Sequence, residues 1–170
     1  MQFRNRVPIF GWAVVVAFAC AVAVSTQAVS PFSGTWRLNV AKSKWSPGPP
    51  SKSGTNRYEV TQDGFKGVLD GVNGQGQTTH TEYTCRFDGK DCPITGTVDG
   101  KAIPAPTGAD VVAWKKIDDY TYEYVVKLKG QILSTTRIVI AKDGKTQTRT
   151  TTGKNAQGQT VNNTAVYEKQ

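Results

Sequence analysis

Two arginines in strand-like runs, Arg137 and Arg149, are the side chains best suited to holding an acidic ligand. A guanidinium that faces a protein interior is costly to bury without a partner, and an anion relieves that cost. Aromatic residues in neighbouring runs supply apolar area for the rest of such a ligand. The sequence therefore predicts a site for a small apolar or amphipathic molecule, formed by Tyr58, Tyr83, Trp114, Tyr122, Tyr124, Arg137, Arg149 and Tyr167. A slip of one residue in either arginine's strand would turn its side chain outward.

Catalytic patterns are scarce. The chain has one histidine, His80, and Glu82 lies two residues away on the same strand face, where its carboxylate would orient the imidazole. A solvated polar strand face explains this pair equally well. Asp118 and Asp119 are adjacent, and strand alternation points neighbouring side chains apart, so they favour a turn over cooperating carboxylates. The sequence contains no nucleophile elbow, zinc-protease motif or phosphate-binding loop, and we expect neither an enzyme nor a cofactor or metal site.

Cys85 and Cys92 flank the segment RFDGKD. A two-residue type I′ turn at Asp88 and Gly89 would place the two cysteines opposite each other. Directly opposed strand residues have Cα atoms about 4.5 to 5.5 Å apart, which suits a disulfide. A three-residue loop with Gly89 in the left-handed conformation would instead place Cys85 opposite Asp91. We expect the disulfide, because the spacing fits no standard metal pattern.

Strands and tight turns account for nearly the whole chain after Phe32. Asp-Gly pairs recur between β-rich runs, and no stretch shows the apolar spacing of an amphipathic helix. The expected strands cover residues 33–40, 55–62, 65–70, 78–87, 90–97, 110–117, 120–129, 132–141, 146–152 and 161–169. The sequence therefore predicts an all-β fold, an antiparallel up-and-down β-barrel of about ten strands, in which closure removes both exposed edges.

Two polar segments echo each other, NGQGQT at 73–78 and NAQGQT at 155–160. Each is preceded by a strand, an Asp-Gly turn and a second strand, and each is rich in loop-forming residues. We interpret them as repeated hairpin connectors. A binding loop is the alternative.

A Gly-x-Trp stands at the head of the expected barrel, in FSGTW at 32–36. It resembles the Gly-x-Trp signature of the calycin superfamily, which comprises the lipocalins and the intracellular fatty-acid-binding proteins. The resemblance implies that Gly34 lets the first strand bend sharply and that Trp36 plugs the closed end of the barrel. The ending VYEKQ is similar to that of the fatty-acid-binding branch. GTWRLN and AVYEKQ are also similar to segments of uncharacterised exported bacterial lipocalin-like proteins.

The chain departs from this family at the ligand anchor and at the lid. Fatty-acid-binding proteins hold a carboxylate with an Arg-x-Tyr in the last strand, where this chain has Ala165 and Tyr167. Arg137 and Arg149 are the candidates to replace the missing charge. The helical lid is replaced by AKSKWSPGPPSKSGTN, whose prolines and glycines do not favour helices. In this segment we expect Trp45 to pin the loop to the barrel; contact with ligand is the alternative.

The N-terminus has the layout of a secretory signal peptide. Two arginines precede an apolar stretch at 9–24, which is followed by small residues up to Ala28. The stretch is shorter than the roughly 20 residues that cross a bilayer. We therefore expect a signal peptide at 1–28 and one lipocalin-like domain at 29–170. An uncleaved anchor and lipid attachment at Cys20 are the alternatives.

The charge pattern bears on partners. The chain has a net charge of +8, but its lysines are spread across turns, and we expect no nucleic-acid partner. We expect an exported protein, periplasmic or extracellular, with no stable membrane insertion after cleavage. The first hypothesis for its function is binding of a small apolar or amphipathic ligand. The alternative is an envelope or extracellular interaction module, whose barrel is filled by its own side chains and whose loops bind carbohydrate or peptide. The volume inside the barrel separates the two.

Overall fold

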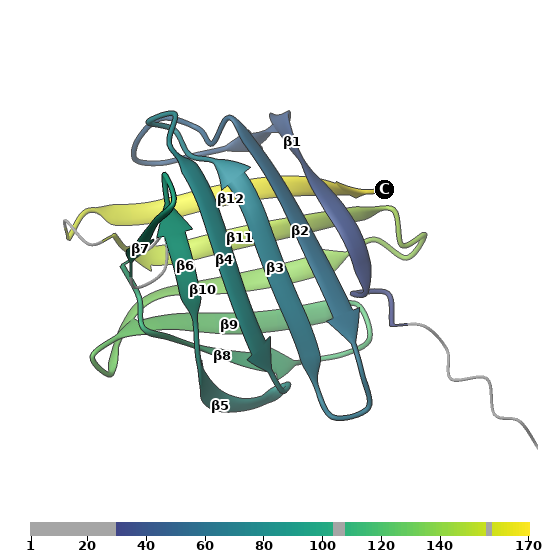
Figure 1. The fold of residues 1–170 in the computed structure, drawn as a ribbon. Coiled ribbons are helices and arrows are strands. Elements are labelled where there is room, and N and C mark those ends of the chain that lie inside the picture. The colour runs from purple at the N-terminus through teal and green to yellow at the C-terminus, as the bar shows by residue number, and fades with distance from the viewer. Residues whose placement is uncertain (1–29, 104–107, 156–157) are drawn as a thin grey trace, which may run out of the picture.

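The computed structural model describes residues 30–103, 108–155 and 158–170, and these form twelve β-strands and no helix (Figure 1). The strands are β1 (Gly34–Lys44), β2 (Ser53–Val60), β3 (Phe65–Val72), β4 (Thr78–Cys85), β5 (Asp88–Pro93), β6 (Thr95–Val98), β7 (Lys101–Ile103), β8 (Val111–Lys116), β9 (Thr121–Leu128), β10 (Gln131–Ile140), β11 (Thr146–Lys154) and β12 (Thr160–Lys169). Within these ranges no helix is available to cross a membrane. The expected signal peptide and Cys20 lie outside the described residues.

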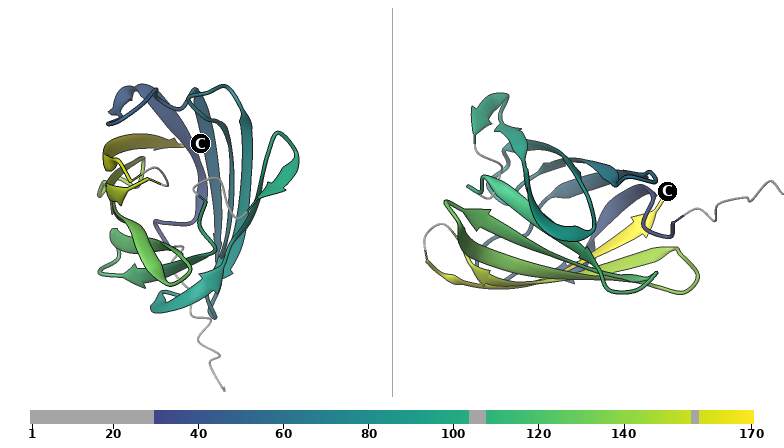
Figure 2. Two further views of the ribbon diagram at one scale, coloured as in Figure 1. Left: turned by 90° about the vertical axis from the view of Figure 1, so that its left-hand side faces the viewer. Right: turned by 90° about the horizontal axis from the view of Figure 1, so that it is seen from below.

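All twelve strands belong to one antiparallel sheet, in the order β5-β8-β9-β10-β11-β12-β1-β2-β3-β4-β6-β7. The sheet curls through 299°, so that β2, β3 and β4 cross in front of β9 to β12 (Figures 1 and 2). Most neighbours in the sheet are also neighbours in the chain, because hairpin turns join them. The all-β, barrel-like fold expected from the sequence is confirmed.

The expected count of about ten strands is too low by two. The run expected as a single strand at 90–97 is two strands with different partners, β5 paired with β8 and β6 paired with β4. Pro93 ends β5, since proline has no N–H to continue a ladder. The short strand β7 then pairs with β6 and was not expected.

We expected that a continuous ladder of hydrogen bonds would close the barrel and leave no exposed edge. The sheet instead keeps two edge strands. The sheet ends at β5 on one side and at β7 on the other. The segment between β5 and β6 spans the gap: the N–H of Ile94 donates to the carbonyl of Asp110 at 3.2 Å, and the hydroxyl of Thr95 donates to the carbonyl of Glu82 at 3.5 Å. We call this segment, residues 93–95, the crossover.

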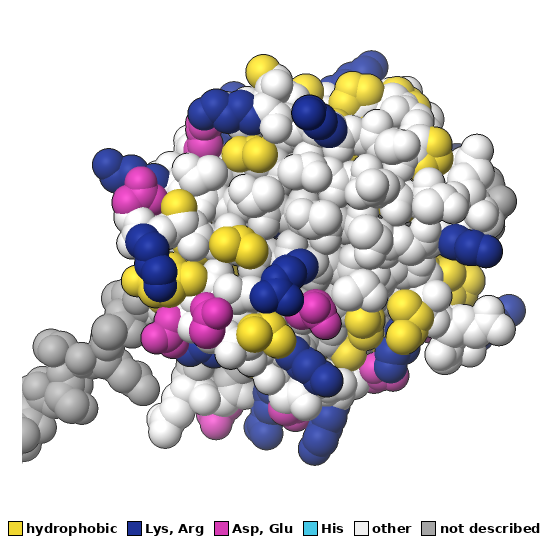
Figure 3. Space-filling model, turned by 180° about the vertical axis from the view of Figure 1, so that it is seen from behind, with side chains coloured by type: hydrophobic (Ala, Val, Ile, Leu, Met, Phe, Trp, Pro, Cys, Tyr) yellow, Lys and Arg dark blue, Asp and Glu magenta, His cyan; other side chains and the backbone are white. Residues whose placement is uncertain are grey.

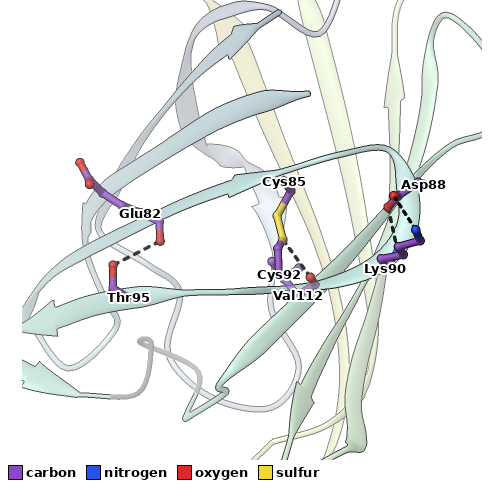
Figure 4. The surroundings of a disulfide bond; sticks show 7 residues. All are labelled: Glu82, Cys85, Asp88, Lys90, Cys92, Thr95 and Val112. Atoms are coloured by element: carbon purple, nitrogen blue, oxygen red, sulfur yellow. Dashed lines mark hydrogen bonds and ion pairs between the residues drawn. A yellow bond between two sulfur atoms is a disulfide. The ribbon is translucent and has the colours of Figure 1, made fainter. Parts of the chain in front are cut away.

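A disulfide joins Cys85 of β4 to Cys92 of β5 beside the crossover, with Cα atoms 5.7 Å apart (Figure 4). The expected bond is present, but the expected hairpin register around it is wrong, because β4 pairs with β6 and forms no ladder with β5. The disulfide thus links two parts of the sheet that their own backbone ladders leave separate.

The described residues of the two echoing segments make matching hydrogen bonds, as expected for hairpin connectors. Asn73 accepts at its backbone oxygen from the N–H of Gly76, and its side-chain amide donates to Gln77 at 3.0 Å. Asn155 makes the equivalent bond to the side chain of Gln159, at 2.8 Å. An asparagine side chain that bonds within its own turn stabilises the connection independently of any ligand.

An aromatic cluster fills one end of the barrel. Its members are Phe32, Tyr58, Phe65, Phe87, Trp114 and Tyr122. The ring of Phe32 lies at the centre, 4.3 Å from that of Tyr58 and 4.6 Å from that of Tyr122. Tilted and edge-on packing of this kind stabilises beyond the area that it buries. We call this end of the barrel the packed end.

Trp36 and Gly34 lie at the packed end. Trp36 is fully buried and donates its indole N–H to the carbonyl of Phe32 at 3.0 Å. Gly34 has a φ of +119°, a conformation that side chains disfavour, and a Cβ there would lie 2.8 Å from Cε of Lys169. Glycine thus allows the first strand to start beneath the Lys169 stem, whose ammonium lies 5.1 Å from the Trp36 ring.

Charges on the outer surface are mixed in sign. Figure 3, seen from behind, shows a broad area of uncharged polar side chains and backbone, with basic and acidic groups toward its margins. On β11 the less buried residues Thr148, Thr150 and Thr152 alternate with buried Gln147 and Arg149.

Candidate functional site

A cavity of about 260 Å³ lies between the packed end and the loops that follow β1 and β3. Its apolar wall comes from Leu38, Leu69, Ile94, Val112 and Val126, and its aromatic wall from Tyr83, Tyr124 and Tyr167. It reaches the surface beside exposed Ser53 and the connector residue Asn73. This volume corresponds to the space of roughly nine water molecules.

Glycine in β3 makes room for the aromatic wall. A Cβ on Gly67 would lie 2.6 Å from Cε2 of Tyr83 and 3.1 Å from Cε1 of Tyr58. Any side chain at this position would displace one of these rings. The glycine therefore lets Tyr83 lie flat across the sheet, between the packed end and the cavity.

Arg149 of β11 is buried at the boundary between the packed end and the cavity, with 5% of its surface exposed. Its Nε donates to Oε1 of Gln147 at 2.5 Å, and its Nη2 donates to the hydroxyl of Tyr58 at 3.0 Å. The amide oxygen of Asn56 accepts from both terminal nitrogens at 3.1 Å, since the opposite amide orientation would set N–H groups against N–H groups. The guanidinium is therefore held by neutral oxygens from β2 and β11.

The ring of Tyr167 covers the guanidinium, with the carbon of the guanidinium 4.5 Å from the ring centre. Burial lowers the pKa of Arg149, but attraction to the oxygens of Tyr58 and Tyr167 outweighs this effect, and the pKa lies above its ordinary value. Burial in turn raises the pKa of Tyr83 and of Tyr124. The site thus holds one positive charge among neutral phenols, and no ion pair to Arg149 forms within the described residues.

The six aromatic residues expected to bind ligand fall into two groups. Tyr83, Tyr124 and Tyr167 line the cavity. Tyr58, Trp114 and Tyr122 are fully buried and belong to the aromatic cluster, where they form the base beneath the cavity.

Arg137 is the exception, because its expected inward placement is wrong. Its side chain is 55% exposed and lies 4.0 Å from the carboxylate of Glu123 on the outer face. The inward positions of β10 are its buried neighbours Thr136 and Ile138. Polar residues occur on both faces of this strand, and the alternation in its sequence did not distinguish them.

Two polar residues of the site were not expected from the sequence. Asn56 is 3% exposed and Gln147 is fully buried. Each stands two residues from an inward aromatic or basic residue, Asn56 before Tyr58 and Gln147 before Arg149. That period of two was the signal that places them on the inner face.

The other candidate groups lie outside the cavity. His80 is on the outer face, with Nδ1 2.7 Å from Asp70 and Nε2 3.8 Å from Glu82, and Arg57 pairs with the same Asp70. His80 and Glu82 therefore belong to a solvated polar strand face, which was one of the two interpretations of their sequence. In the described ranges no three His, Cys, Asp or Glu side chains are placed to hold a metal ion. Trp45 is half-buried in the loop after β1.

Asp118 and Asp119 form a turn, as expected. Asp118 accepts from the backbone N–H of Tyr120 at 2.8 Å, which lowers the pKa of its carboxyl. Asp119 pairs with Lys116 at 2.7 Å. The two carboxylates have separate partners and do not act on a common site.

No protein-family model matches the chain, and no curated protein matches it. The strand order and the curl of the sheet are those of a barrel-like β fold, without a family being identified.

Proposed function

We propose that this protein binds a small amphipathic molecule in the cavity, as a lipocalin-like member of the calycin superfamily would. The observation that carries the proposal is a cavity of about 260 Å³ walled by three tyrosines, beside a buried arginine that has no carboxylate partner among the described residues. Concave, mostly apolar sites with a few convergent polar groups are typical of ligand binding. The Gly-x-Trp at the packed end supports the family assignment.

The size of the cavity limits the ligand. Space for roughly nine waters suits a compact molecule or one end of a longer one, and a long acyl chain would extend out past Ser53. Burial of about 150 Å² of apolar ligand surface would contribute about 4 kcal/mol, which alone corresponds to a Kd of about 1 mM. Polar contacts at the inner end must supply any tighter binding.

The cavity also weighs against the alternative function. An interaction module with a barrel filled by its own side chains would leave no such space, whereas here side chains fill only the packed end. A carbohydrate or peptide bound by the loops is therefore the second candidate. The described surface offers no feature that favours it.

We also propose export to the periplasm or the extracellular space after removal of residues 1–28. The disulfide supports this location, because such bonds persist in oxidising compartments. N-terminal sequencing of the protein recovered from outside the cytoplasm tests the proposal. A mature chain that starts near Val29 supports it, and a chain that retains Met1 or carries lipid on Cys20 contradicts it.

Blocking the cavity tests the binding function. Thr81 lies inside the cavity on β4, and Thr84 on the same strand faces outward. In ligand-observed NMR with short carboxylic acids and ketones, Thr81→Phe should abolish saturable binding that the wild type shows. Thr84→Phe is the matched control and should bind as the wild type does. Binding that survives in Thr81→Phe, with the fold intact by circular dichroism, would place the ligand elsewhere.

A further inference from the structure

Arginine donates hydrogen bonds and accepts none, so each polar neighbour of Arg149 must turn an oxygen toward it. Gln147 shows how strong this requirement is. Its oxygen is held by Arg149 at 2.5 Å, and its buried amide nitrogen has no hydrogen-bond partner among the described residues. Leaving a buried donor unpaired costs the full desolvation of that group. The arginine therefore fixes the orientation of the groups around it even at the expense of their other bonds.

The same requirement fixes the amide of Asn56, which lines the cavity. Its oxygen faces the guanidinium and accepts from both terminal nitrogens at 3.1 Å. Its nitrogen, with two N–H donors, is consequently turned away from Arg149. Because Arg149 holds the oxygen of Asn56, the N–H groups of this amide are directed to the end of the cavity nearest Arg149. We call this end the floor of the cavity.

Tyr58 makes a further contact with the guanidinium. Its hydroxyl oxygen accepts from Arg149 at 3.0 Å, so its proton points away from the guanidinium. Burial and a hydrogen bond with Tyr58 both raise the pKa of Tyr83. A hydrogen bond raises the pKa of a phenol when the phenol is the donor, so the proton of Tyr83 points to Tyr58. Asn56 is therefore the residue through which Arg149 directs hydrogen-bond donors to the cavity floor.

We propose that the cavity selects ligands whose inner end carries an acceptor oxygen, a carboxylate or a carbonyl, and that Arg149 acts as a positioning residue that turns the amide N–H groups of Asn56 toward that oxygen. The inference rests on the proposed binding function. The buried positive charge adds to the selection, because a cationic head group would be brought near a guanidinium that pairs with no carboxylate in the part of the chain that the structure describes. Alkyl ammonium ions and plain alkanes are the ligands that the floor disfavours.

Four probes of matched length test the selection: hexanoate, 2-heptanone, hexylammonium and heptane. Dissociation constants for the wild-type protein come from protein-detected NMR titration. We expect hexanoate and 2-heptanone to bind at least about tenfold more tightly than heptane, as one or two hydrogen bonds would give, and hexylammonium to bind most weakly. Equal affinities for all four would overturn the inference while leaving the binding function standing. If none of the four binds, both fail.

Asn56→Asp separates the positioning role from simple packing. The new carboxylate would pair with Arg149, which keeps the buried charge compensated, and it removes the amide donors from the floor. We expect hexanoate to lose at least about tenfold in affinity while heptane is unchanged. Asn162→Asp, the same change on the exposed outer face of β12, is the control and should leave all four affinities as they are.

A ratio of the hexanoate affinity to the heptane affinity that is unchanged in Asn56→Asp would show that the floor does not contact the ligand and would overturn the inference.

Discussion

Removal of the Cys85–Cys92 disulfide should weaken the barrel at its closure. The two cysteines are 7 residues apart in the sequence, and the chain-entropy relation for such a loop gives about 2.4 kcal/mol of stabilisation at about 25 °C. No ladder joins β4 to β5, so the bond is not duplicated by backbone pairing there. We therefore expect Cys85→Ala/Cys92→Ala to lose about 2 to 3 kcal/mol in the free energy of unfolding.

Urea unfolding of the oxidised wild type, the reduced wild type and the double variant measures this loss. With a slope of about 1.5 kcal/mol per molar urea, the midpoint should fall by about 1.6 M in both altered forms. Agreement between them separates the crosslink from the packing of the sulfur atoms, and reductant added to the double variant should change nothing. Amide exchange should rise first in β5 and the crossover. A loss below about 0.5 kcal/mol would refute the reasoning, since the crossover would then hold the closure without the crosslink.

Three further outcomes are expected. Gly34→Ala should cost about 1 to 3 kcal/mol in unfolding experiments, because φ is positive there and the new Cβ meets Lys169; a neutral change would contradict the geometry. In alkaline titration followed by tyrosine absorbance, Tyr83 and Tyr124 should ionise last. Their pKa is raised by burial, so stability should fall as pH rises above about 10, and ionisation with the other tyrosines would contradict their burial. Arg137→Ala should leave hexanoate affinity unchanged, and a selective loss would return it to the site.

Much of the fold was predictable because hairpin connections and strand alternation are local. The Asp-Gly turns and β-rich runs placed nine of the twelve strands. The division at Pro93 was not predictable from alternation, since it depends on which distant strand lies alongside each half of the run. The cysteine spacing predicted the disulfide correctly, but the hairpin register proposed for it was wrong. Two cysteines that are 7 residues apart can be joined without a hairpin between them.

The candidate site was predictable where one face of a strand is clearly apolar. Tyr124 lies on an amphipathic strand, and its inward placement follows from its neighbours Tyr122 and Val126. Arg137 and Arg149 have similar polar surroundings in the sequence, and only the register of the sheet distinguishes the outward from the inward one. The volume of the cavity depends on how side chains from many strands meet, and no single segment encodes it.

Intermolecular nuclear Overhauser effects between the protein and bound hexanoate test the central claim most directly. We expect contacts from the hexanoate chain to the rings of Tyr83, Tyr124 and Tyr167, with the carboxylate end nearest the amide of Asn56. Saturable binding with contacts only to residues outside the cavity, or the reverse orientation with the methyl end at Asn56, would contradict it.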